Sequence, residues 1–488
     1  MSIGIRKALT LSFAQSWISL LLSAASIIIV SRLLTPAEVG VFSVAAGLVA
    51  LVHMLRDFGV SEFIVQDAAL DDDRVRTAFT INLVIAWVLA ALLFACSGLV
   101  GDFYGNAGAA RVTRVLSLVF ALLPFGTTQV AMLRRNMRYD TLLKIRIGES
   151  TARSATAIGL AFAGFSYMSM AWAGVAGMAA LVVGCAILGR QYRVRGLGLK
   201  SWRQVVHFGT NRTLSDVVGQ AGAQAANIVV GKMLGMAAAG LYSRGYGVVN
   251  MFQTSVVGAV GNVAFPAFAK EHRETDSAAG LYLKSVVYLS GVCWPFFAFA
   301  AIMAFPMIRI AFGDRWLPAV PLMQWLCVAA LVRVVTLQSG TFLTAIGRYR
   351  DVTRIEVTFQ LTRIGLCIGA AFYGLVAVAA VQVLVYALAA VLYYRWLARL
   401  QPLRIKRLLR ALAPSAGVTL ASCVVPLAVL MAWPGTIQQH YLSAFVVAST
   451  GGALGWYGGL LATGHPLAGE IRRGVAMLRE RASRVPPT

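Results

Sequence analysis

Charged side chains, mostly arginines, interrupt several of the long apolar runs in this sequence. At such positions stand Arg56, Asp57, Glu62, Glu149, Arg153, Arg212, Asp216, Arg244, Arg333, Glu356 and Arg363. A charge at the centre of a bilayer costs roughly 2.5 to 3.5 kcal/mol on insertion scales, so these groups usually face a watery cavity or a partner. The planar guanidinium presents paired donors to the oxygens of an anion. The excess of arginine therefore predicts a binding site for a negatively charged group.

The candidates for this site differ in how their charge could be balanced. The binding candidates are Arg56, Arg244, Arg212, Arg333 and Arg363. Arg56 and Arg244 have no acidic residue four positions later, and they are the strongest candidates. Arg212 precedes Asp216 by four residues, a helical spacing at which the two charges could neutralise each other instead.

The acidic residues allow two interpretations. Asp57, Glu62 and Asp216 could carry a coupling proton or cation, in a protein driven by an H+ or Na+ gradient. They could equally balance nearby arginines, and this second interpretation is favoured. Glu149 and Arg153 are four residues apart near a helix end, and we expect them to form a structural pair.

No pattern in the sequence predicts catalysis or metal binding. The cysteines Cys96, Cys185, Cys293, Cys327, Cys367 and Cys423 stand singly in apolar runs, without a CxxC motif or a cysteine and histidine cluster. Single cysteines of this kind are typical small packing residues. We therefore expect no catalytic residues, no metal site, no disulfide framework and no cofactor.

The elements that must position the charges are membrane helices. The chain has 59% hydrophobic and 13% charged residues, with a mean hydropathy of +0.74. A bilayer core about 30 Å thick needs roughly 20 apolar residues per helix. Fourteen runs meet this need, at 9–31, 38–65, 77–100, 112–133, 144–166, 168–189, 206–231, 238–265, 281–305, 317–346, 353–373, 374–397, 411–432 and 441–463. The sequence predicts an all-α, polytopic membrane protein with about fourteen transmembrane helices.

The net charge of +24 is a topology signal. When the helices are traced from a cytoplasmic start, the groups beginning at Arg134, Arg190, Arg348, Arg395 and Arg472 all fall on the same side. Positive residues accumulate in cytoplasmic loops, so both termini are expected in the cytoplasm. Attraction to anionic membrane lipids is a secondary expectation, and nucleic-acid binding is not expected.

An internal repeat divides the predicted helices. Leu34, Ala37, Gly40, Ser43 and Gly47 recur 200 residues later, and Arg138, Tyr139, Arg153, Gly159, Phe162 and Gly164 recur 210 residues later. Such parallel repeats are associated with transporters whose substrate lies between two halves. We predict a six-helix lobe over 1–189, a connector over 190–205, a pseudo-symmetric six-helix lobe over 206–398, and two further helices with a basic tail over 399–488.

Several segments resemble one family across essentially the whole chain. They are LLTPAEVGVFSVA at 33–45, LRDFGVSEFIVQ at 55–66, the segment 133–177, and the connector entering HFGTN at 207–211. These residues are similar to the polysaccharide transporters, the Wzx-type flippases of the multidrug/oligosaccharidyl-lipid/polysaccharide exporter superfamily. The resemblance implies a two-lobed flippase in the bacterial inner membrane that moves an undecaprenyl-pyrophosphate-linked oligosaccharide outward by alternating access. A polysaccharide polymerase or export complex is an expected partner.

Two other functions remain open from the sequence. A multidrug or small-solute antiporter would share the two-lobed design, but the arginine excess suits a pyrophosphate head better. A membrane-embedded polysaccharide polymerase or ligase would need a sizeable outer segment for its acceptor chemistry. The longest predicted outer loops, near 100–111 and 309–318, are short, so a transporter is favoured over an enzyme.

Overall fold

The computed structural model describes residues 2–483 apart from a few short gaps. The gaps are 57–59, 68–69, 195, 201, 276, 401–404 and 433–438. All the secondary structure in this described part is helical. Two compact units, Met1–Ser243 and Arg244–Thr488, divide the chain, and each unit is described below by itself.

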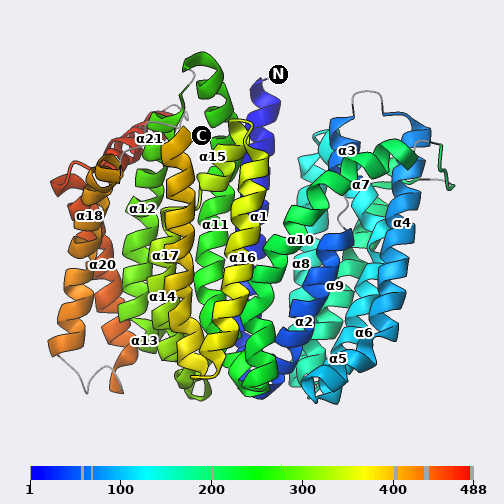
Figure 1. The fold of residues 1–488 in the computed structure, drawn as a ribbon, viewed down its shortest axis with the longest axis horizontal. Helices are drawn as coiled ribbons and strands as arrows, with labels where there is room; N and C mark the ends of the chain where they lie inside the picture. The colour runs from blue at the N-terminus through cyan, green and yellow to red at the C-terminus, as the bar shows by residue number, and fades with distance from the viewer. Residues whose placement is uncertain are drawn as a thin grey trace. The chain divides into compact units, whose positions relative to one another are not determined.

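Unit 1 is built of helices that run back and forth along one direction (Figure 1). Its elements are α1 (Ser2–Leu33), α2 (Pro36–Arg56), α3 (Val60–Gln66), α4 (Asp72–Ala95), α5 (Ser97–Tyr104), α6 (Ala107–Leu122), α7 (Pro124–Arg135), α8 (Tyr139–Phe162), α9 (Tyr167–Leu188), the 3-10 turn η1 (Arg190–Tyr192) and α10 (Trp202–Met233). The first residues of α11 (Met236–Thr275) also belong to this unit.

Unit 2 contains the rest of α11 and the helices that follow it. These are α12 (Ala279–Ile302), α13 (Ala304–Phe312), the 3-10 turn η2 (Asp314–Ala319), α14 (Val320–Val334), α15 (Ser339–Ala345), α16 (Tyr349–Ala371), α17 (Leu375–Leu400), α18 (Ile405–Ala432), α20 (Tyr441–Ala462) and α21 (Pro466–Ser483). Phe268, Tyr282 and Phe342 form the aromatic centre of one core cluster of this unit.

The prediction of an all-α polytopic membrane protein is confirmed. Each predicted run lies in one helix or in consecutive helices. Nine helices of the described part are long and apolar enough to cross a membrane, or ten if the bent pair α6 and α7 is one span. That pair bends by 48° where Pro124 begins α7, since proline cannot donate the backbone hydrogen bond of a continuous helix. The more polar helices α8, α10, α11 and α16 stand outside this set.

The two copies of the repeated segment contact each other within unit 1. A Cβ atom on Gly40 would lie 1.7 Å from the carbonyl oxygen of Met236, and one on Gly240 would lie 1.9 Å from that of Pro36. Ser43 also donates a hydrogen bond of 3.0 Å to Ser243. The glycines therefore recur because the two helices touch backbone to backbone at this crossing.

Three glycines of α20 form the surface that packs on α18. Gly451, Gly455 and Gly459 all face this neighbour, and a Cβ on Gly455 would lie 2.4 Å from the carbonyl oxygen of Ala421. Small residues at this spacing let two membrane helices approach closely. This motif therefore packs within the chain.

Candidate functional site

Two arginines of unit 2 meet at one tyrosine ring. Arg333 of α14 donates a hydrogen bond of 3.2 Å to the hydroxyl of Tyr386 on α17, and its Cζ lies 5.2 Å from the ring centroid. The Cζ of Arg363 on α16 lies 5.7 Å from the same centroid. The ring's negative faces attract cations, so Tyr386 holds two positive charges in one small region of the helical bundle.

The packing around Tyr386 fixes its ring. Tyr386 and Arg363 are both buried, and the ring packs against Phe359 of α16 with centroids 6.1 Å apart. Phe359, Val385, Ala389 and Ala329 form one core cluster with it. Helices α14 and α16 both pack against α17. An arginine from each of them can therefore contact Tyr386 of α17.

A carboxylate near this cluster has neutral donors around it. Glu356 of α16 accepts hydrogen bonds from the hydroxyl of Tyr393, at 2.5 Å, and from the side-chain amide of Gln360, at 3.2 Å. Glu356 lies two turns before Arg363 on the same helix. Its hydrogen bonds thus join α16 to α17, through Tyr393.

Arg244 lies beside a buried tryptophan. Its Cζ is 5.7 Å from the ring of Trp316, which is fully buried. The Nε of Arg244 is itself buried and has no hydrogen-bond partner in the part of the chain that the structure describes. A buried donor of this kind can bind an acceptor at little further desolvation cost.

Two arginines of α8 in unit 1 share a single acid. Glu149 of α8 is buried and accepts from Arg146 at 2.8 Å and from Arg153. The expected structural pair of Glu149 and Arg153 is confirmed, with Arg146 as an additional partner. These arginines stabilise α8 by charge pairing.

The other sequence candidates are only partly described. Arg56 is buried at the end of α2 and belongs to unit 1, whereas Arg244 belongs to unit 2. Asp57 lies outside the described residues, and so do the side chains of Glu62, Arg212 and Asp216. The binding role of Arg56 and Arg244, and the coupling role of the acids, remain predictions.

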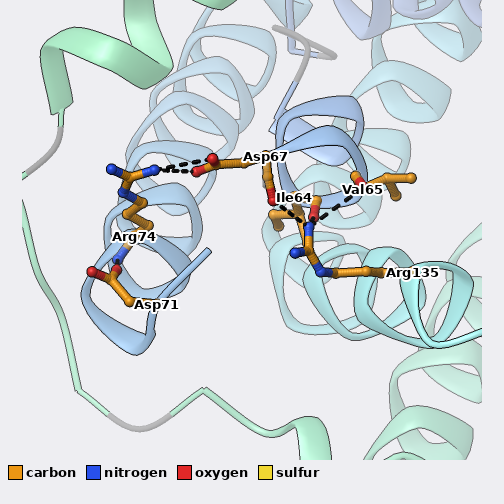
Figure 2. A network of polar contacts seen from close by, with 6 residues as sticks. All are labelled: Ile64, Val65, Asp67, Asp71, Arg74 and Arg135. Carbon is orange, nitrogen blue, oxygen red and sulfur yellow. Dashed lines mark hydrogen bonds and ion pairs between the residues drawn. The ribbon is translucent and has the colours of Figure 1, made fainter. Parts of the chain in front are cut away.

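A separate polar network stabilises one end of unit 1 (Figure 2). Arg135 of α7 donates to the carbonyl oxygens of Ile64 at 2.8 Å and Asp67 at 2.7 Å, capping the end of α3. Arg74 of α4 forms an ion pair of 2.7 Å with the carboxylate of Asp67. The carbonyl groups of the last turn of a helix need such donors. Arg135 and Arg74 thus link α3 to α7 and to α4.

The connector before α10 is attached to α4. Lys200 forms an ion pair of 2.8 Å with Asp73, and this hydrogen bond raises the pKa of Lys200. The backbone amide of Gly198 donates to the hydroxyl of Thr80 at 3.0 Å. The connector therefore belongs to the body of unit 1.

Sequence reasoning missed the tyrosines of the site. It selected Arg333 and Arg363 by their charge, but not Tyr386 or Tyr393. The available signal was three tyrosines, Tyr386, Tyr393 and Tyr394, inside the 25-residue apolar span Leu375–Arg399, where a hydroxyl needs a partner. The partners of Tyr386 and Tyr393 stand on other helices, so no local pattern indicates them.

The fold of this chain resembles the folds of solved membrane proteins. It superimposes on the lipid II flippase MurJ with a TM-score of 0.69, 11% identity and coverage of 92% of this chain and 98% of that one. An inward-facing multidrug transporter of the MATE family matches with a TM-score of 0.63 and 17% identity, over 78% of this chain and 94% of that one. At such identities the likeness shows the fold alone, which is that of a multi-pass helical membrane protein.

Sequence comparison identifies the family. Residues 29–321, more than half of the chain, match the family described as polysaccharide biosynthesis protein. The chain belongs to this family of polysaccharide biosynthesis proteins, in agreement with its sequence resemblance to the polysaccharide transporters.

Three curated relatives are named for the biosynthesis or transport of a surface polysaccharide. The lipopolysaccharide biosynthesis protein WzxC of Escherichia coli is 23% identical, over 68% of this chain and 67% of the relative. The teichuronic acid biosynthesis protein TuaB of Bacillus subtilis is 24% identical, over 61% and 62%. The succinoglycan biosynthesis transport protein ExoT of Rhizobium meliloti is 25% identical, over 62% and 61%. The alignments thus cover about two thirds of each relative's length.

Proposed function

We propose that this protein is a flippase for undecaprenyl-pyrophosphate-linked oligosaccharide units in the bacterial inner membrane. It moves these units from the cytoplasmic to the periplasmic leaflet by alternating access, for the synthesis of an exopolysaccharide, capsule or O-antigen. The family and the names of the relatives support this proposal. A polysaccharide polymerase or export complex is the partner that would take up the product.

The observation that carries the proposal is the pair of arginines at Tyr386. Arg333 and Arg363 both lie within 6 Å of one ring centroid, inside helices that cross the bundle. A pyrophosphate carries several negative oxygens, and guanidinium groups can bind such oxygens through two parallel hydrogen bonds. Two cations held side by side offer a binding site for this head group.

The internal repeat shows how the second unit differs from the first. Arg153 and Arg363 occupy equivalent positions, but the residue one turn earlier is Glu149 in the first copy and Phe359 in the second. In the first copy the acid binds its arginine. In the second copy an aromatic residue supports Tyr386 at this position. The second unit is therefore the better candidate for the anion site.

The proposal assigns the chain transport and no covalent chemistry. The described residues contain no group of three or more histidines, cysteines or carboxylates that could hold a metal ion. We expect purified protein to leave lipid-linked oligosaccharide chemically unchanged. Formation of a new covalent product would favour a polymerase or ligase.

Substitution of Arg333 and Arg363 tests the site. In proteoliposomes carrying a fluorescent lipid-linked oligosaccharide, Arg333→Ala and Arg363→Ala should each lower cargo affinity by more than tenfold, since losing a buried charge contact costs about 2 to 5 kcal/mol. Lysine should restore part of the transport, because it keeps the charge and loses the planar fork. Arg56→Ala and Arg244→Ala belong in the same series.

Arg354→Ala is the matched control, because Arg354 is exposed on the same helix as Arg363. It should transport at the normal rate. Normal transport by well-folded Arg333→Ala and Arg363→Ala variants would remove the site assignment. If an alanine variant does not accumulate, the corresponding lysine variant is assayed instead. Its cargo affinity should also be reduced, because lysine loses the planar fork.

A further inference from the structure

The last helix, α21, begins immediately after a membrane span. Helix α20 ends at Ala462 and α21 starts at Pro466, after a turn in which Gly464 has a φ of +63°. Figure 1 shows α21 turning away from the long direction of α20. Three connecting residues span at most about 10 Å, so α21 starts close to the end of the candidate span α20.

A buried histidine fixes the first turn of α21. The backbone amide of Leu467 donates to Nδ1 of His465 at 3.2 Å, so the ring proton is assigned to Nε2. This nitrogen lies 3.0 Å from the hydroxyl of Ser415 on α18, to which it donates. His465 is only 1% exposed, and α21 is therefore anchored by its start to the body of unit 2.

Gly291 of α12 makes room for this anchor. A Cβ atom at position 291 would lie 2.6 Å from Cε1 of His465 and 2.8 Å from Cδ1 of Leu467. The carbonyl oxygen of Gly291 also accepts a hydrogen bond of 2.9 Å from the indole of Trp456 on α20. Helices α12, α18 and α20 thus share one fixed junction with the beginning of α21.

The sequence of α21 is amphipathic and basic. Apolar residues recur at the helical period, at Leu467, Ile471, Val475, Leu478 and Ala482, and the residues between them include Arg472, Arg473, Arg479 and Arg481. Glu470 and Glu480 are the acids of this helix. Arg473 exposes 76% of its side chain. A helix with one apolar stripe and an arginine-rich remainder is typical of segments that lie in a membrane interface.

We propose that α21 lies in the plane of the membrane and binds the head groups of anionic phospholipids through its arginines. Beyond Leu467, which packs on Gly291, an apolar stripe favours the boundary between head groups and acyl chains, and an arginine-rich face favours the phosphates. His465 sets where the helix leaves the bundle, and the end of α20 sets its depth. An anionic lipid surface fits this helix because it supplies both an apolar layer and negative charge.

Hydrogen exchange of the full-length protein in nanodiscs tests this proposal. One preparation contains phosphatidylcholine alone, and the other contains added phosphatidylglycerol. We expect amides of 470–483 to exchange about tenfold more slowly with the anionic lipid, and high salt should reduce this difference because the contacts are exposed. Replacing the four arginines of α21 by glutamine should abolish the dependence on lipid charge.

The control variant replaces Arg350 and Arg354 by glutamine, because both are exposed on α16. It should keep the lipid dependence of α21. Unchanged exchange rates in α12 and α18 show that the variants remain folded. Equal exchange in the two lipids, or a lipid effect that survives the loss of all four arginines, would overturn the proposal in favour of packing alone or a protein partner.

Discussion

At the scale of single residues, the neighbours of an arginine decide what it does. Arg153 binds Glu149 on its own helix, whereas Arg333 binds a tyrosine hydroxyl on a different helix. Both stand in the membrane-spanning part of the sequence, and their charge alone does not distinguish them. The charge of Arg153 is balanced by a carboxylate of its own helix, whereas the partner of Arg333 on α17 is a neutral hydroxyl.

Loss of Glu149 should destabilise unit 1. Glu149→Gln leaves Arg146 and Arg153 without their shared carboxylate. Breaking a fully buried pair costs about 3 to 5 kcal/mol, but the side chain of Arg153 is 52% exposed, so we expect a loss of about 1 to 2 kcal/mol. A lower melting temperature in detergent would show this. Arg153→Gln added to Glu149→Gln should recover part of the loss, and an unchanged melting temperature in the single variant would contradict the structural role.

Acid should loosen the junction at His465. Burial lowers the pKa of His465 below its ordinary value of 6.5, because the neutral ring is stable in this site and the charged ring is not. The stabilising contribution is therefore present above pH 6.5 and is lost as the pH falls through the lowered pKa. The melting temperature of the wild type should drop more between about pH 7 and pH 5 than that of His465→Gln. Parallel pH profiles for the two proteins would refute this prediction.

At the scale of elements, glycine spacing decides how closely two helices approach. Gly455 of α20 faces the backbone of α18, whereas a Cβ atom on Gly458, three residues later, would have nothing within 4 Å. The two glycines lie on the same helix and have the same intrinsic cost. Their surroundings alone distinguish them, which makes them a matched pair for substitution.

Gly455→Leu should separate α20 from α18. Its Cβ would lie 2.4 Å from the carbonyl oxygen of Ala421, so the backbone of one helix must move. Overpacking typically costs about 1 to 3 kcal/mol, and we expect faster proteolysis between the last two spans and a lower melting temperature. Gly458→Leu is the control and should behave like the wild type. Equal stability of the two variants would show that the close approach is unnecessary.

At the scale of the whole molecule, the distribution of cations sets the expected orientation. The structure supports one part of this scheme within unit 1, where Arg135 contacts Ile64 and Asp67. The C-terminal ends of α3 and α7 thus lie at the same end of the unit, as a cytoplasmic placement of both ends requires. The side of the membrane itself remains a prediction.

Reporter fusions should establish the orientation of the chain. Fusions at Arg135, Lys200, Arg348, Arg407 and the C-terminus should report the cytoplasm, and fusions near Asn106, Asp314 and Gln438 should report the periplasm. The positive-inside rule gives the physical reason. A periplasmic signal at Lys200 would contradict six helices before the connector, since it requires an odd number of crossings.

The sequence by itself determined the helices, the repeat and the family of this protein. A long apolar run in a bilayer folds as a helix, because a helix satisfies the hydrogen bonds of its own backbone N–H and C=O groups. Charges inside these runs stand out against such a background, which is how the sequence indicates the candidates Arg56, Arg212, Arg244, Arg333 and Arg363. The positions of these helices and of the charges within them follow from local composition.

The tertiary structure alone decided which of these residues meet. Tyr386 follows Arg333 by 53 residues, and His465 follows Ser415 by 50, distances at which no helical period connects two side chains. The glycine crossing of α2 and α11 joins residues 200 apart. These pairs lie on different helices and meet only when the helices pack. Their contacts are therefore a property of the assembled bundle.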